Sequence, residues 1–206
     1  MKNLIVSLLC LLGATSLSAK EEPAKAIPIT KQLKSVDVSH GKANVKLDRR
    51  SREHGVNCPP ACIQPMYPFG AAGVETVGEL ELIEYLRRKE QGEPILLVDS
   101  RAPQRAAKGV IPGAVNIPHS ELRDSDPMAV ADILEHRFGA VQIDGLWDFR
   151  DAKTLLLYCD GIVCARSVKA ILSLLKYGYP AHKLKYYRGG FRSWKSQGLR
   201  VVTFEE

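Results

Sequence analysis

Apolar positions repeat with two different periods between residues 76 and 202. Short continuous apolar runs are too short for buried helices and predict strands, buried on both faces where the run is longest. Such runs predict strands at residues 94–100, 115–118, 154–158 and 183–187. Apolar residues spaced three and four apart predict helices between them. Strands that alternate with helices indicate an α/β fold, with a mainly parallel central sheet and helices on both faces.

Three of the predicted helices have a recognisable start and an apolar face. The first follows Thr76, which with Glu79 has the spacing of a capping box. The second starts at Asp126-Pro127, and the third follows Arg166-Ser167 and stops at Gly178. The residues expected to face the core are Val77, Leu80, Ile83 and Leu86, then Ile133, Leu134 and Phe138, and finally Val168, Ile171, Leu172 and Leu175. Residues 140–151 follow no clean period and are expected to pack as a lid or loop over the sheet.

The first nineteen residues have the three regions of a secretory signal peptide. One lysine precedes an apolar run from Leu4 to Leu12, and small residues follow up to Ala19. The run is too short to cross a membrane. We therefore expect cleavage near Ala19 and a periplasmic or secreted mature chain with no membrane span. Cys10 is expected to leave with the peptide.

Residues 20–72 are interpreted as a basic N-terminal arm followed by a linker rich in Cys and Pro. Residues 20–57 carry nine Lys or Arg against five Asp or Glu, out of a net charge of +6 for the whole chain. Because residues 20–57 contain no aromatic residue, we expect a solvated arm and no nucleic-acid partner. Residues 36–39 and 43–47 alternate with period two around a glycine, which predicts a small hairpin.

Two cysteines, Cys58 and Cys62, flank a Pro-Pro-Ala segment in this linker. In an exported chain they predict a disulfide, or one end of each of two longer bridges. A metal or iron–sulfur site shared with Cys159 and Cys164 is the alternative. No nearby histidine motif supports such a site, so no metal is assigned.

The candidate chemistry lies where the strand predicted at 154–158 ends. Cys159 opens a short loop that leads into the helix following Arg166-Ser167. A thiol that faces a helix N-terminus meets unpaired backbone N–H groups and the positive end of the helix dipole. These groups and the Arg166 cation favour the thiolate, which is the nucleophilic form. Cys159 is therefore the candidate nucleophile, and Cys164 is a second thiol in the same loop.

This strand, cysteine loop and Arg-Ser helix start resembles the active-site loop of the rhodanese (sulfurtransferase) family. Three further segments match family motifs in the same order, with valine at position 110 where histidine is usual. They are Leu96–Arg101, which contains Asp-x-Arg, then Gly109–Pro118, and finally Tyr187–Trp194 followed by Gly198-Leu199. The resemblance covers residues 73–202 and implies a rhodanese-like domain there, with a short tail at 203–206.

The resemblance implies a sulfurtransferase that needs no cofactor. The Cys159 thiolate would take the outer sulfur of thiosulfate or a related sulfane donor as a persulfide and pass it to a thiophilic acceptor. The partners implied are a small-molecule or protein sulfur donor and a thiol acceptor. Loop N–H groups and the arginine would hold the donor anion. The residues implied are Asp160, Gly161, Ile162, Val163, Cys164, Ala165, Arg166 and Ser167, with Asp99 and Arg101 in a supporting, mainly structural role.

The loop departs from the family's usual Cys-x-x-Gly-x-Arg-Ser pattern, because Arg166 lies seven positions after Cys159 and Cys164 occupies the added length. Three alternatives follow. The domain is a catalytically silent binding module, or a thiol redox protein using both loop cysteines, or a phosphatase, which usually has five residues between its cysteine and arginine. His119, His136 and His182 receive no role, and the oligomeric state is left open.

Overall fold

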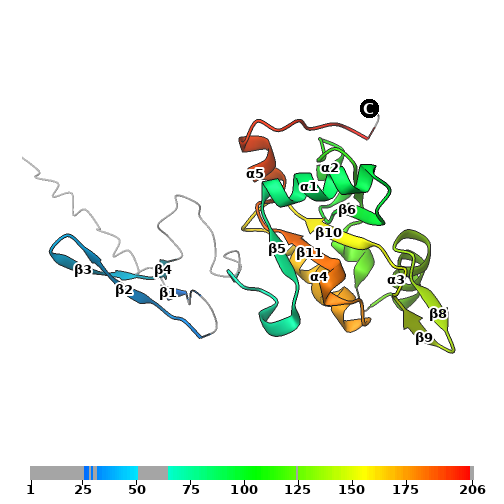
Figure 1. The fold of residues 1–206 in the computed structure, drawn as a ribbon, viewed down its shortest axis with the longest axis horizontal. Helices are drawn as coiled ribbons and strands as arrows, with labels where there is room; N and C mark the ends of the chain where they lie inside the picture. The colour runs from blue at the N-terminus through cyan, green and yellow to red at the C-terminus, as the bar shows by residue number, and fades with distance from the viewer. Residues whose placement is uncertain (1–25, 28, 30–31, 51–64, 124, 205–206) are drawn as a thin grey trace, which may run out of the picture.

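The computed structural model describes residues 26–27, 29, 32–50, 65–123 and 125–204 (Figure 1). Its centre is a sheet of five parallel strands in the spatial order β5-β11-β10-β6-β7. The strands are β5 (Glu75–Val77), β6 (Ile95–Asp99), β7 (Ala114–Asn116), β10 (Thr154–Tyr158) and β11 (Leu184–Tyr187). The predicted α/β fold with a parallel sheet is confirmed. Since β10 is central, the residue after it lies between neighbouring strand ends on both sides.

Helices surround this sheet. The α-helices are α1 (Glu79–Glu90), α2 (Pro103–Ala106), α3 (Pro127–Asp132), α4 (Arg166–Lys176) and α5 (Gly190–Ser196). Shorter turns are η2 (Gly70–Ala72), η3 (His119–Leu122), the π-helical η4 (Ile133–Arg137) and η5 (Ala181–Lys183). In the part of the chain that the structure describes, none of the helices has the length and apolar character needed to cross a membrane.

The two faces of the sheet bury two separate apolar clusters, because successive strand residues point to opposite sides. On β10, Leu155 and Leu157 join one cluster, whereas Leu156 and Tyr158 join the other. Helix α4 and the α3–η4 segment pack on the first face. Helices α1 and α5 contribute Leu82 and Trp194 to the second. Helices therefore cover both faces, as predicted (Figure 1).

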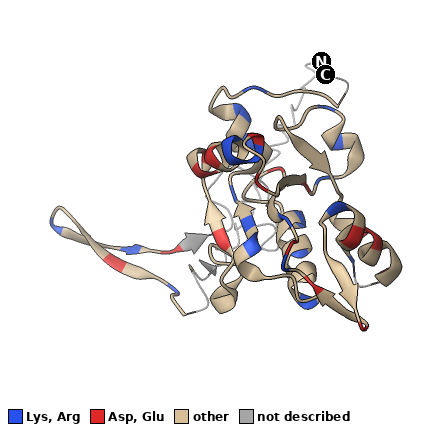
Figure 2. Ribbon diagram, turned by 45° about the vertical axis from the view of Figure 1, so that its right-hand side comes forward, with Lys and Arg blue, Asp and Glu red and all other residues tan. Residues whose placement is uncertain are grey.

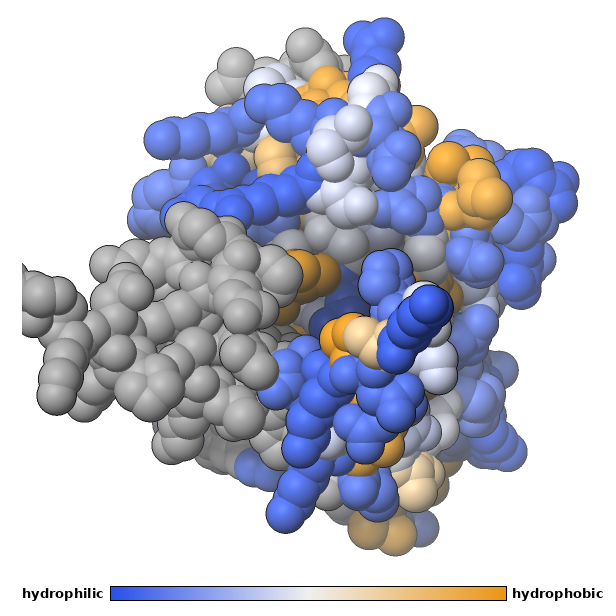
Figure 3. Space-filling model, turned by 90° about the vertical axis from the view of Figure 1, so that its left-hand side faces the viewer, coloured by the Kyte–Doolittle hydropathy of each residue, from blue (hydrophilic) through white to orange (hydrophobic). Residues whose placement is uncertain are grey.

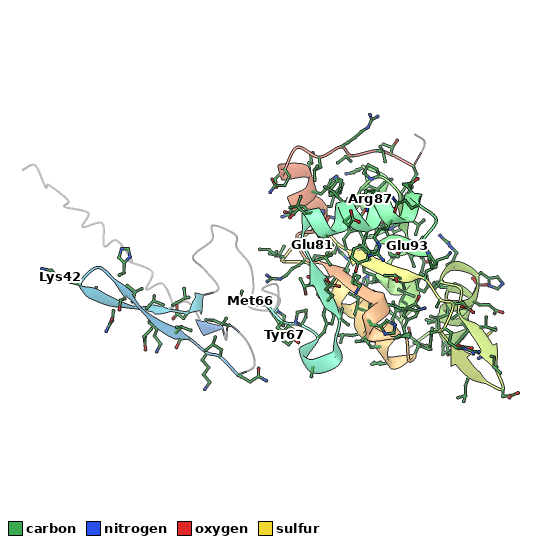
Figure 4. All side chains as sticks on the ribbon, viewed as in Figure 1. Lys42, Met66, Tyr67, Glu81, Arg87 and Glu93 are labelled. Atoms are coloured by element: carbon green, nitrogen blue, oxygen red, sulfur yellow. A yellow bond between two sulfur atoms is a disulfide. The ribbon has the colours of Figure 1, made fainter. Side chains whose placement is uncertain are left out.

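The predicted start of α1 is wrong, and of the four residues expected to face the core, Leu80 and Ile83 are exposed. Thr76 and Val77 lie in β5, and α1 begins two residues later, with the Glu81 carboxylate accepting the Gly78 N–H at 3.0 Å. The helical period therefore runs from Leu82 to Tyr85 and Leu86, while Leu80 is 79% exposed. Glu81, Arg87 and Glu93 project outward from α1 and the turn after it (Figure 4).

Helix α4 also differs in detail from the prediction, because Leu174 is buried in place of Leu172. Residues 140–151 pack against the first face of the sheet through Ala140 and Phe149, but they are not an irregular loop. They form an antiparallel hairpin, β8 (Val141–Ile143) and β9 (Leu146–Asp148), whose three β8 residues are exposed. Each hairpin strand has three residues, which is too short to establish a period.

The hairpin predicted in the N-terminal arm is present as β2 (Val36–His40) and β3 (Ala43–Leu47), with Lys42 at its tip (Figure 4). A second antiparallel pair joins β1 (Ala26–Ile27) and β4 (Arg49–Arg50). Charged residues of both signs occur on the hairpin and on the α/β part (Figure 2). The predicted signal peptide, Cys58 and Cys62 lie outside the described residues.

Candidate active site

Cys159 follows directly after β10, at the carboxyl edge of the sheet where ligands of open α/β sheets bind. Two backbone hydrogen bonds from the start of α5 fix the loop that it opens. The Phe191 N–H donates to the Cys159 carbonyl at 2.9 Å, and the Arg192 N–H donates to the Asp160 carbonyl at 3.0 Å. Cys159 is buried, with 2% of its surface exposed. The sheet and α5 together hold the candidate nucleophile in place.

A glycine allows α5 to approach the loop this closely. Gly190 has φ +63°, a backbone conformation that side chains disfavour. A Cβ atom at this position would lie 2.5 Å from the Cys159 carbonyl oxygen and 2.7 Å from the Gly161 nitrogen. Both atoms belong to the loop backbone and cannot move aside without moving Cys159. The absence of a side chain at Gly190 is therefore what lets the start of α5 pack directly against the backbone of the Cys159 loop.

A buried polar network lies under the loop and contains the predicted supporting pair, Asp99 and Arg101. Arg101 is 2% exposed, and its Nε lies 2.9 and 3.0 Å from the two Asp99 carboxylate oxygens. Its Nη2 donates to the Gly109 carbonyl at 2.7 Å, and the guanidinium stacks 4.0 Å from the Phe191 ring centre. These contacts link β6, the loop before β7, and α5. They tie both residues to the framework that carries the loop.

Tyr158 completes this network from β10. Its hydroxyl donates to Asp99 Oδ2 at 3.0 Å and accepts the Ile111 N–H at 3.2 Å. Burial raises the pKa of Tyr158, and the Asp99 carboxylate raises it further, so the hydroxyl stays protonated and can donate. The residue immediately before Cys159 is thus held at both its side chain and its strand backbone.

An open pocket of about 480 Å³ lies beside the loop, and basic side chains dominate its rim. Its lining residues are Arg105, His119, Asp160, Val163, Cys164, Ala165, Arg166, Lys169 and Arg192. The one carboxylate among them, Asp160, lies 3.4 Å from Arg105 and 3.6 Å from Arg166, and 3.9 Å from the buried Arg101. Four cations against one carboxylate leave the rim with excess positive charge, which suits an anionic ligand.

The pKa of His119 responds to the positive charge of its neighbours. Burial lowers the pKa of its imidazole, and the neighbouring cations Arg123, Arg166 and Lys169 lower it further. A cation next to a histidine disfavours a second positive charge there. His119 is therefore neutral at pH 7, and the charge of the pocket comes from arginine and lysine.

The structure joins the sulfur atoms of Cys159 and Cys164 in a disulfide, with their Cα atoms 6.1 Å apart. A tight turn brings Cys164 back, because its N–H donates to the Gly161 carbonyl at 2.9 Å. That N–H is therefore not available to the ring of anion donors predicted for residues 160–167. Arg166 Nη1 lies 3.7 Å from the Cys164 sulfur, and Cys164 is 8% exposed.

The structure brings most of the predicted site residues to one place. Cys159, Asp160, Cys164, Arg166 and the Asp99–Arg101 pair all lie at or just under the pocket, whereas the Ile162 side chain is 56% exposed. Sequence reasoning missed Arg105, Lys169 and Arg192, and assigned His119 no role. Lys169 lies three positions after Arg166 on α4, and this helical spacing could have placed it on the same side.

Three atoms with metal-ligand chemistry cluster here, one each from Cys159, Asp160 and Cys164, all within 4.8 Å of one another. The Asp160 carboxylate, however, lies near three arginine side chains. Guanidinium groups at these distances repel a metal cation. The donor set therefore does not suit a metal site.

Residues 82–197 match the family described as Rhodanese-like domain. This match spans more than half of the chain, and the protein belongs to that family, which confirms the resemblance of its motifs. A sulfurtransferase of Allochromatium vinosum is 28% identical over 129 residues, which is 63% of this chain and 98% of that protein. The HTH-type transcriptional regulator Rv0324 of Mycobacterium tuberculosis is 30% identical over 118 residues, which is 57% of this chain but only 42% of the regulator.

Two solved structures are similar as well. The human single-domain sulfurtransferase TSTD1 is 29% identical, and the match covers 61% of this chain and 98% of that one, with a TM-score of 0.44. The BH2092 protein of Bacillus halodurans is 21% identical, with coverage of 64% and 77% and a TM-score of 0.46.

Proposed function

We propose that this protein is a rhodanese-type sulfurtransferase whose nucleophile is Cys159. The observation that carries the proposal is the position of Cys159, held at the end of the central strand and next to a pocket with a basic rim. The thiolate attacks the outer sulfur of thiosulfate or a related sulfane donor. The sulfur–sulfur bond of the donor breaks, sulfite leaves with the electron pair, and a persulfide remains on Cys159. A thiophilic acceptor such as cyanide or a thiol then removes the outer sulfur.

The surroundings of the loop support both halves of this reaction. Arg166 and the other rim cations attract the dianionic donor and stabilise the departing sulfite. Cysteine is nucleophilic once its pKa is lowered, so the reaction needs no partner base. Cys159 must be a free thiolate at the start, because the thiolate is the nucleophile and a disulfide sulfur is an electrophile. The active form of the enzyme is therefore the one in which Cys159 and Cys164 are reduced.

A thiosulfate and cyanide assay on pre-reduced protein tests the proposal. We expect thiocyanate formation by the wild type and its loss in Cys159→Ser, with a persulfide on Cys159 detected by mass spectrometry after thiosulfate treatment. The double variant Cys58→Ser/Cys62→Ser is the matched control and should keep its activity. A persulfide that survives in Cys159→Ser but vanishes in Cys164→Ser would move the nucleophile to Cys164. A folded wild type with no turnover would instead favour the binding-module alternative.

We also propose that the protein acts after export, because its first nineteen residues resemble a signal peptide. Protein from an exported fraction should begin near Ala19 or Lys20. An intact Met1 on the purified native protein would contradict this.

A further inference from the structure

We propose that Cys164 is the resolving cysteine of this site and discharges the Cys159 persulfide as hydrosulfide. The inference rests on the proposed function and adds a second outcome to it. Sulfur need not be transferred to an acceptor molecule. It can leave as hydrosulfide, with the two electrons supplied by the two cysteines, which become a disulfide.

The pair has the geometry that this step requires. The Cα atoms of Cys159 and Cys164 are 6.1 Å apart, inside the separation of about 4.4–6.8 Å that disulfides span. The Gly161–Cys164 turn fixes one cysteine, and β10 with α5 fixes the other, so the loop needs no rearrangement to bring the sulfurs together. The longer loop, which makes this chain unlike the family's usual pattern, is what supplies Cys164.

The charges around Cys164 favour its thiolate. Arg166 Nη1 lies 3.7 Å from its sulfur, and Lys169 lines the same pocket. Nearby cations lower the pKa of a thiol and raise the fraction present as thiolate. The Cys164 sulfur therefore lies in positive surroundings, which favour its thiolate as the attacking group.

The proposed step balances in atoms and electrons. The Cys164 thiolate attacks the inner sulfur of the Cys159 persulfide and forms the Cys159–Cys164 bond. The bond between the inner and outer sulfurs breaks, and the outer sulfur leaves as hydrosulfide with the electron pair and the persulfide proton. The two cysteines are oxidised together by two electrons, and the sulfane sulfur is reduced. Each turnover then requires an external dithiol, which becomes a disulfide as it restores the two thiols.

Proximity favours this internal route over an external acceptor. Well-oriented intramolecular reactions reach effective concentrations of about 10⁵–10⁸ M, far above any free thiol. A small acceptor in large excess, such as cyanide in the assay above, still intercepts part of the persulfide as thiocyanate, and without such an acceptor the internal attack dominates.

The structure also indicates where the external dithiol enters. Cys164 lines the pocket, whereas Cys159 is not among its lining residues. Attack from the pocket therefore falls on the Cys164 sulfur and expels Cys159 as the thiolate. This order returns Cys159 to the form that accepts the next sulfur.

A single-turnover experiment without free reductant separates the two proposals. The full chain is reduced, freed of reductant and mixed with thiosulfate, and sulfite, hydrosulfide and free thiols are measured. We expect wild type and Cys58→Ser/Cys62→Ser to release sulfite and hydrosulfide in equal amounts and to lose two thiols. Cys164→Ser should release sulfite, retain the persulfide, and form hydrosulfide at least about tenfold more slowly, because the internal attack is lost. Cys164→Ala provides a second variant should the serine destabilise the loop.

The outcomes are distinguishable. Wild type that releases sulfite but keeps a stable persulfide overturns the resolving role alone and leaves the sulfurtransferase proposal in place. Equal hydrosulfide release by wild type and the Cys164 variants does the same. Absence of sulfite with every protein overturns the proposed function, and the resolving role with it.

Discussion

Two arginines four positions apart, Arg101 and Arg105, both lie near the Asp160 carboxylate, but one is buried and the other is exposed to solvent. Arg101 is 2% exposed and is held by Asp99, a backbone carbonyl and an aromatic ring. The Arg105 side chain is 57% exposed and lines the pocket. The comparison shows that charge and sequence position do not reveal what an arginine does here. The fixed partners and the exposure do: the buried Arg101 supports the loop, whereas the exposed Arg105 side chain lies on the pocket rim beside Asp160, where it can reach a ligand.

The two environments differ in energy for a physical reason. Removing one partner of a buried ion pair leaves the other charge without water or a counter-ion. An exposed pair loses little, since water and salt already screen it. The same substitution at both positions therefore separates the framework from the rim.

The largest expected effect is that of Arg101→Met. It should lower the free energy of unfolding by about 3–5 kcal/mol, because the Asp99 carboxylate is left buried and unpaired. Arg105→Met is the matched control and should cost less than about 1 kcal/mol. Urea denaturation at neutral pH measures both. Equal losses for the two variants would refute the division between framework and rim.

A substitution at Gly190 tests the framework where α5 contacts the Cys159 loop. Gly190→Ala and Gly198→Ala share the cost of a side chain at positive φ, about 1–2 kcal/mol. Only at Gly190 does the new Cβ meet backbone, whereas nothing lies within 4 Å of a Cβ at Gly198. Gly190→Ala should therefore cost about 1–3 kcal/mol more and should also lower cyanide-dependent turnover. A similar loss of stability at both positions, with full turnover, would show that the loop does not depend on this contact.

The sequence was sufficient for the fold class and for the position of the Cys159 loop within it. The apolar runs located four of the five strands of the central sheet, and the Cys159 loop could be placed at the end of one of them, since these signals are local. The apolar face of α1 could not be placed correctly, because Val77 continues a plausible helical period but pairs in β5. The rim was missed for a different reason. Arg105, Lys169 and Arg192 lie on three separate helices, α2, α4 and α5, and come close to one another only in the folded chain.

The smallest expected effect concerns the electrostatic influence of the rim on His119. Lys169 is one of three cations that add to burial in lowering the pKa of this imidazole, with Arg123 and Arg166. Lys169→Gln should therefore raise the His119 pKa toward its ordinary value. An NMR titration of the imidazole protons measures the change. His136 and His182 serve as internal references in the same spectra, and Lys195→Gln, outside the set of acting charges, is the matched control.

The same titration fixes the sign of a pH effect on stability. A lowered pKa means that the folded protein favours the neutral form of His119. As the pH falls below 6.5, the ordinary pKa of histidine, the unfolded chain therefore binds a proton at this residue before the folded protein does. The contribution of His119 is then fully favourable above about pH 6.5 and is lost as the pH falls through the folded pKa. Lys169→Gln brings the two pKa values closer, so its free energy of unfolding should depend less on pH in this window than that of the wild type. If Lys169→Gln leaves both the pKa and this pH dependence unchanged, the rim does not act on His119 through Lys169, and burial and the two arginines must account for its lowered pKa.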